Sequence, residues 1–93
     1  RELQAEINSG VSDMSIEQLN FWNSIKISPE KWLEKEYGNQ GGGFWVVATF
    51  LDKIIWYNDI EEGFNTGSYL ERGQILEYRA EQDELNFAID KIK

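Results

Sequence analysis

Residues 41–59 hold the most apolar and β-prone stretch of the chain. Segment 44–50 consists almost wholly of β-branched and aromatic residues, and a second such segment, 54–57, follows the turn-forming residues 51–53. These side chains fit a pleated, half-buried surface, so the stretch predicts a β-hairpin at the centre of the core. Strand alternation places one set on the first face of the hairpin and the other set opposite: Phe44, Val46, Ala48 and Phe50 against Trp45, Val47 and Thr49. In the return strand, Ile54 and Trp56 oppose Ile55 and Tyr57.

Both faces of this hairpin are apolar, whereas a sheet that is wet on one side shows a polar residue at every second position. We therefore expect either that helices cover both faces or that one face receives a partner.

Helix signals precede the hairpin. Residues 1–14 have weak helical spacing and predict a marginal helix or an ordered arm. Ser15 and Gln18 have the spacing of a capping box, which predicts the start of an amphipathic helix of about ten residues. The sequence Ser28-Pro29-Glu30 predicts a second, short helix that reaches about Tyr37 and ends at Gly38.

After the hairpin, residues 58–68 are rich in turn formers and predict a long surface loop, with a fourth strand left open. Alternation over residues 74–80 predicts a third strand at a sheet edge. A C-terminal helix follows, capped by Gln82 or Asp83 and buried along a stripe that includes Leu85 and Ile92. The predicted fold is a single α+β domain over residues 1–93, in the order α-α-β-β-β-α, with a small antiparallel sheet of three to four strands.

Charge limits the choice of partner. Seventeen acids against nine bases give a net charge of −8. Such a field repels phosphate backbones and anionic membrane surfaces and favours a basic protein partner, so we expect no nucleic acid and no membrane. Segment 59–84 contains eight acids and two bases, and thus carries −6 of that charge.

The chain has no cysteine and no histidine. Disulfides, thiolate nucleophiles, histidine-based triads and histidine-based zinc sites are therefore excluded within it. Asp59, Glu61 and Glu62 match a calcium loop poorly, since the next acid is Glu71. We expect no catalytic, metal-binding or cofactor-binding residues, no enzymatic activity and no membrane span, and a cytoplasmic location.

Loops on a rigid scaffold are frequent binding sites, and aromatic anchors within a charged rim are typical of interfaces. The candidate partner-binding residues combine these two properties: Trp56, Tyr57, Asp59, Glu61, Glu62, Phe64, Tyr69, Glu71 and Glu77. The alternative interpretation is a solvated acidic face over aromatics that belong to the core.

Small size, strong acidity and the aromatic and acidic loop resemble bacterial toxin-immunity proteins. The element order over residues 28–93, with Gly42-Gly43-Phe44-Trp45 entering the sheet and Ile55-Trp56-Tyr57-Asn58 in its second strand, is similar to the SUKH superfamily of such proteins. The resemblance implies an inhibitor that occludes a basic, nuclease-like toxin domain. Two other functions remain open, namely a homodimer or larger homo-oligomer that associates through a sheet edge or face, and a small-ligand binder with a pocket between Trp45 and Trp56.

Overall fold

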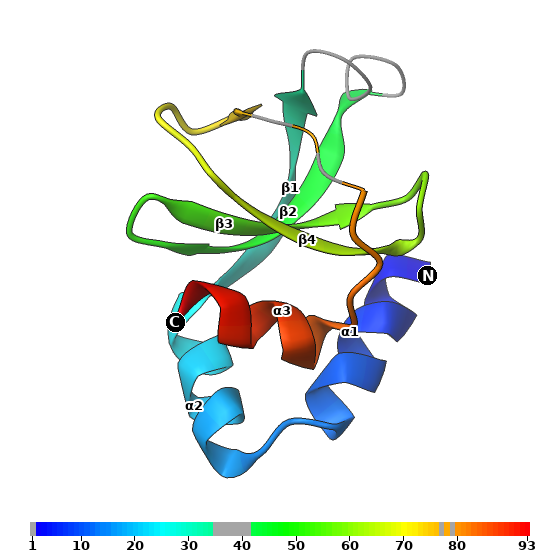
Figure 1. Cartoon of the computed structure of the whole chain (residues 1–93), viewed down its shortest axis with the longest axis vertical. Helices are drawn as coiled ribbons and strands as arrows, with labels where there is room; N and C mark the ends of the chain where they lie inside the picture. The colour runs from blue at the N-terminus through cyan, green and yellow to red at the C-terminus, as the bar shows by residue number, and fades with distance from the viewer. Residues whose placement is uncertain (1, 35–41, 77, 79) are drawn as a thin grey trace.

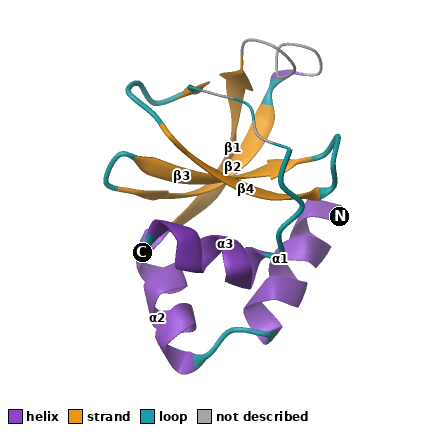
Figure 2. Ribbon diagram, in the orientation of Figure 1, coloured by secondary structure: helices purple, strands orange, loops and turns teal. Residues whose placement is uncertain are grey.

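The structure is a computed structural model that describes residues 2–34, 42–76, 78 and 80–93. In this described part of the chain, three helices lie on one side of a curled five-stranded sheet (Figures 1 and 2). The elements in chain order are α1 (Glu2–Ser12), α2 (Ile16–Ile25), β1 (Lys26–Glu34), β2 (Phe44–Phe50), β3 (Lys53–Asn58), β4 (Gly63–Ser68), β5 (Gln74–Ile75) and α3 (Leu85–Ile92). The α+β class is confirmed, but the sheet has five strands and is mixed.

The strand order is β4-β3-β2-β1-β5. Neighbouring strands from β4 to β1 pair antiparallel, whereas β5 pairs parallel to β1, with Leu33 opposite Gln74. Because β4 and β5 lie at opposite edges, the chain crosses the sheet between Ser68 and Gln74 (Figure 1).

The predicted hairpin is β2 and β3, and the predicted alternation of β3 is confirmed. In β2 it holds only at the start. A bulge between Val46 and Ala48 leaves Val47 as an extra residue, so both Val47 and Ala48 face the helices. Phe50 also packs on that side, opposite to the face that strict alternation predicts.

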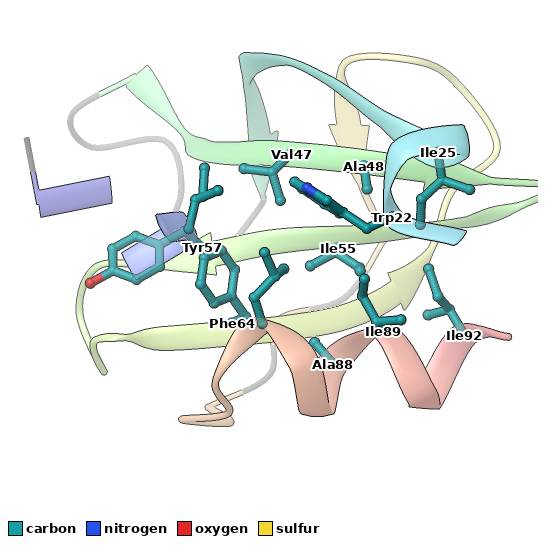
Figure 3. Close-up of a cluster of buried hydrophobic side chains, with 12 residues drawn as sticks. Trp22, Ile25, Val47, Ala48, Ile55, Tyr57, Phe64, Ala88, Ile89 and Ile92 are labelled. Atoms are coloured by element: carbon teal, nitrogen blue, oxygen red, sulfur yellow. The ribbon is translucent and has the colours of Figure 1, made fainter. Parts of the chain in front are cut away.

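The helices cover one face of the sheet and form the helix-side core with it. Figure 3 shows side chains of the sheet and of α3 pointing toward one another. The helix-side core consists of Ile7, Trp22, Ile25, Val47, Ala48, Ile55, Tyr57, Phe64, Leu85, Ala88, Ile89 and Ile92.

The other face forms a second core, which consists of Trp32, Phe44, Val46, Ile54, Trp56 and Ile75. The helices do not cover it (Figure 1), contrary to the expectation that helices cover both faces of the hairpin. Aromatic side chains before and after β5 pack on it: the ring centroids of Tyr69 and Trp32 are 5.2 Å apart, and Tyr78, which follows β5, lies 6.0 Å from Trp56. The chain thus buries both faces of its own hairpin.

The prediction of a second helix is wrong for residues 28–34, because Lys26–Glu34 forms β1. Residues 35–38, where that helix was expected to end, lie outside the described part of the chain. The predicted third strand is reduced to Gln74–Ile75, and residues 77 and 79 of that prediction lie outside the described part of the chain. Residues 63–68 of the predicted loop form β4, the fourth strand that the sequence left open. The helices at the capping box and at the C-terminus are confirmed, although α3 has Glu84 at its N-cap position and no side-chain cap.

Candidate protein-binding surface

The turn between β3 and β4 holds three of the candidate carboxylates. The side chain of Asn58, which is fully buried, accepts hydrogen bonds from the backbone N–H groups of Ile60 (3.0 Å) and Glu61 (3.1 Å). Glu62 adopts a left-handed backbone conformation with φ of 60°, which completes the reversal into β4. Local hydrogen bonding of this kind fixes a turn independently of its exposed side chains. The carboxylates of Asp59, Glu61 and Glu62 are therefore carried by an ordered turn.

A second acidic segment, residues 81–84, lies against β4 although it is distant in sequence. The Asn65 side chain bonds the backbone of Glu81 in both directions, donating to its carbonyl and accepting from its N–H at 2.9 Å each. The backbone N–H of Phe64 donates to the carbonyl of Asp83 at 2.8 Å. Gln82 also donates to the Glu61 carboxylate at 3.3 Å, which connects the two segments directly.

The turn and this segment together form what we call the acidic end of the molecule. It contains six carboxylates: Asp59, Glu61, Glu62, Glu81, Asp83 and Glu84. Lys91 lies 2.6 Å from Asp83 and 3.6 Å from Glu81 and offsets part of this charge. The hydrogen bond to Asp83 raises the pKa of Lys91 above its ordinary value of 10.5, which further favours the charged ammonium form. Six carboxylates and one ammonium group leave a local charge of −5.

Exposed apolar side chains accompany these carboxylates. Ile60 is 55% exposed at the turn, and Phe87 is 57% exposed one helical turn after Glu84. Apolar side chains within a charged rim are typical of protein interfaces. The acidic end thus combines a cluster of carboxylates with exposed apolar side chains.

The structure separates the nine predicted site residues. Asp59, Glu61 and Glu62 lie together in the turn. Glu71 follows the opposite end of β4, and a six-residue strand at about 3.3 Å per residue puts roughly 17 Å between its two ends. Glu77 lies outside the described residues.

The predicted aromatic anchors belong to the interior. Trp56 and Phe64 are 0% exposed and Tyr57 is 3% exposed, so none of them is accessible to a partner of the folded protein. Trp56 and Tyr57 also point to opposite faces of the sheet, into different cores. Tyr69 is half-buried against Trp32. The apolar part of a binding surface must therefore come from other residues.

Ile60 and Phe87 are the apolar residues that the sequence prediction missed. Phe87 does not fall on the buried stripe of its helix, and this spacing could have indicated from the sequence that its side chain is exposed. Nothing in the sequence distinguishes Ile60 from a residue that anchors its loop.

A pocket between Trp45 and Trp56 would need space beside the Trp56 ring. That ring packs against Phe44, with centroids 4.7 Å apart, and against Tyr78. Trp45 lies on the other face, under the Lys31 ammonium group at 5.1 Å from the ring centroid. The two tryptophans therefore do not line a shared site.

Among the described residues, no group of three or more acidic side chains is arranged to hold a metal ion. No helix in the described ranges has the length and apolar character to cross a membrane. Comparisons with family models, with curated proteins and with solved structures found no match to this chain.

Proposed function

We propose that this chain is a small acidic protein-binding module that acts as an immunity or inhibitor protein, by occluding a basic, nuclease-like toxin domain. The observation that carries the proposal is the acidic end, where two segments distant in sequence bring six carboxylates together. A basic domain that binds phosphates presents lysine and arginine side chains, and these carboxylates match them in charge. The module acts by binding and not by catalysis.

Two groups of residues have different roles in this proposal. The carboxylates attract the basic partner over a distance, which raises the association rate. Ile60 and Phe87 lose their contact with water in the complex, and this burial slows dissociation.

The test needs a basic nuclease domain as partner, which is sought first among the products of the genes that neighbour the gene of this chain. We expect a 1:1 complex in which cleavage of nucleic acid is blocked, with association that weakens as salt is added. The double variant Glu61→Lys with Glu62→Lys should slow association about tenfold or more, since it reverses charge within the acidic end.

The matched control is Asp52→Lys with Glu71→Lys. It changes the net charge by the same amount at the opposite end of β3 and β4, where both residues are exposed. Equal slowing by the two double variants would show that overall charge and not the acidic end sets association. Tight binding without loss of cleavage would contradict occlusion.

A second candidate function, self-association at the β5 edge, is favoured by an exposed apolar patch there. Leu70 is 84% exposed, and Leu33 and Leu76 are each 48% exposed. Leu70, Ile75 and Leu76 also line a cavity of about 440 Å³. A patch of this kind is typical of an interface between copies of a chain.

Sedimentation velocity over a range of concentrations distinguishes this function from the first. Self-association predicts a mass that rises with concentration and depends little on salt, and that Leu70→Asp keeps monomeric. Leu51→Asp is the matched control, because Leu51 is 80% exposed in the β2–β3 turn. A monomer at all concentrations would exclude this candidate.

A further inference from the structure

A groove runs between α1 and α2 over the sheet, and none of its lining residues belongs to the acidic end. Its volume is about 310 Å³, at the lower end of the range of small-molecule sites. Residues spaced i, i+3, i+4 and i+7 line it within 4–11 of α1, and residues spaced i, i+3 and i+4 line it within 19–23 of α2; Lys26, the first residue of β1, continues the lining directly after α2. These spacings place one continuous face of each helix along the groove. The side chain of Val47, in β2, forms part of its floor.

The lining of the groove is apolar in depth and polar at the rim. Ile7, Trp22 and Val47 are buried and form the deep part. Asn8, Asn23 and Lys26 are exposed and form the rim. None of the described residues that line the groove is acidic, although 17 of the 93 residues of the chain are. The groove is thus a neutral to positive site on an acidic molecule.

Lys26 differs from the other described bases in its surroundings. Lys53, Arg72 and Lys91 lie within 4.0 Å of carboxylates. Lys31 and Lys93 lie over aromatic rings. In the described part of the chain, Lys26 has neither kind of partner, and its ammonium group is available at the rim.

We propose that this groove binds a small amphipathic carboxylate, an aromatic or branched aliphatic acid. The apolar body of the ligand lies against Trp22 and Ile7, where it displaces water from apolar surface. Its carboxylate accepts hydrogen bonds from the Lys26 ammonium group and from the Asn8 and Asn23 amides. Charge-assisted hydrogen bonds of this kind fix the orientation of the ligand. This site is separate from the acidic end and does not depend on the proposed function.

The probe is 3-phenylpropionate, titrated into the ¹⁵N-labelled protein and followed by NMR. We expect saturable shifts of the side-chain signals of Trp22, Asn8 and Asn23. The neutral analogue 3-phenylpropionamide should bind about threefold or more weakly, because it lacks the charge that Lys26 recognises.

Lys26→Gln should reduce the affinity for the acid to that for the amide. Lys53→Gln is the matched control, since it removes the same charge from an exposed lysine at the start of β3 and should leave the affinity unchanged. Neither variant should alter association with a basic partner.

Three results would overturn the proposal. The first is an absence of saturable shifts at these side chains up to about 10 mM probe, well above the 1 mM dissociation constant that marks weak binding. The second is equal binding of acid and amide. The third is a short peptide with a free C-terminal carboxylate that binds the groove about tenfold more tightly than the probe, which would assign the groove to a protein C-terminus.

Discussion

Asn65 lies fully buried in β4 and joins that strand to residue 81 by two hydrogen bonds. Asn65→Ala removes both bonds and leaves the backbone N–H and carbonyl of Glu81 without these partners. We expect a loss of about 2 to 4 kcal/mol in the free energy of unfolding, from two bonds and the desolvated groups they leave. Urea denaturation measures this loss.

Thr66→Ala is the control, because Thr66 is the next residue in β4 and is only partly buried. It should cost less than half as much as Asn65→Ala. A comparable cost for both variants would mean that the Asn65 hydrogen bonds contribute little beyond the strand itself.

Glu30 accepts a hydrogen bond from the indole N–H of Trp32 at 3.0 Å, and it forms an ion pair with Arg72 at 3.1 Å. The bond from Trp32, and then that from Arg72, lowers the pKa of Glu30 below its ordinary value of 4.5. Because the pKa is lower in the folded state, these interactions stabilise the protein above about pH 4.5. Their contribution is lost as the pH falls through the lower, folded-state value.

Carboxyl ¹³C shifts followed against pH test this assignment. Trp32→Phe removes the donor and keeps an aromatic ring, so it should raise the pKa of Glu30 toward 4.5. Arg72→Gln removes the second hydrogen bond and the charge attraction, and it should also raise the pKa. An unchanged pKa of Glu30 in Trp32→Phe would show that the indole does not control this group.

At the scale of elements, those with strong local signals could be predicted. The capping box at Ser15 is present in both directions, with bonds of 3.1 and 2.9 Å, and α2 begins there. The hairpin of β2 and β3 follows from composition, and α3 follows from its apolar stripe. In each case the local preference and the packing agree.

The predicted second helix fails because pairing outweighs a local signal. Ser28-Pro29-Glu30 suits the start of a helix, but residues 26–34 instead pair with β2 and, through Leu33 and Glu34, with β5. The register shifts between Lys26 and Glu30, so Pro29 lies in a bulge where its missing N–H breaks no ladder bond. Pro29, which from the sequence predicts the start of a helix, therefore lies at an irregularity in a strand.

β4 could not be predicted from its own residues, because glycine, asparagine and serine are poor strand formers. Its structure depends on the free edge of β3, with which all six of its residues pair. A single sequence gives no direct sign of such a long-range pairing.

Gly63, the first residue of β4, lies against the backbone of residue 82. A Cβ at Gly63 would meet the Cα and carbonyl carbon of Gln82 at less than the distance of any real contact. Gly63→Ala should therefore displace residues 81–84 and cost about 1 to 3 kcal/mol. Thermal unfolding measures the cost, and amide NMR shifts at residues 81–84 report the displacement.

Gly67→Ala is the control in the same strand. Its Cβ would have one neighbour, the indole nitrogen of Trp56, at the ordinary contact distance of 3.8 Å. It should cost little and leave residues 81–84 in place. Equal effects of the two variants would indicate a general intolerance of β4 and not a close approach at Gly63.

At the scale of the whole molecule, the charge of segment 59–84 indicates that carboxylates are concentrated there, but the segment does not indicate which of its residues lie together. Sequence proximity grouped Glu71 with Glu61, whereas the length of β4 separates them. It also grouped Trp56 and Phe64 with the carboxylates, although both are needed to fill the cores. Exposure of an individual side chain depends on the complete fold, and the sequence pattern does not report it.

Net charge should affect the stability of the whole molecule. Repulsion within a molecule of charge −8 opposes folding, and salt screens it. We expect the melting temperature to rise by about 3 °C between 0.01 and 0.2 M NaCl, which corresponds to less than 1 kcal/mol for a domain of this size. Circular dichroism at several salt concentrations measures the rise.

Two variants separate local from general repulsion. Glu61→Lys with Glu62→Lys and Asp52→Lys with Glu71→Lys each change the net charge from −8 to −4. If repulsion is concentrated at the acidic end, salt should raise the melting temperature less in the first variant than in the second. Equal losses would contradict that concentration.

The link between Asn65 and residue 81 also determines how this surface can change. The carboxylates that would touch a partner are carried on turns, while the groups that hold those turns, Asn58 and Asn65, are buried. Under the proposed function, substitutions among the carboxylates would therefore alter recognition with little effect on folding, and substitutions of the two asparagines would do the reverse. Descendants of this chain could diverge toward new partners while keeping the same scaffold.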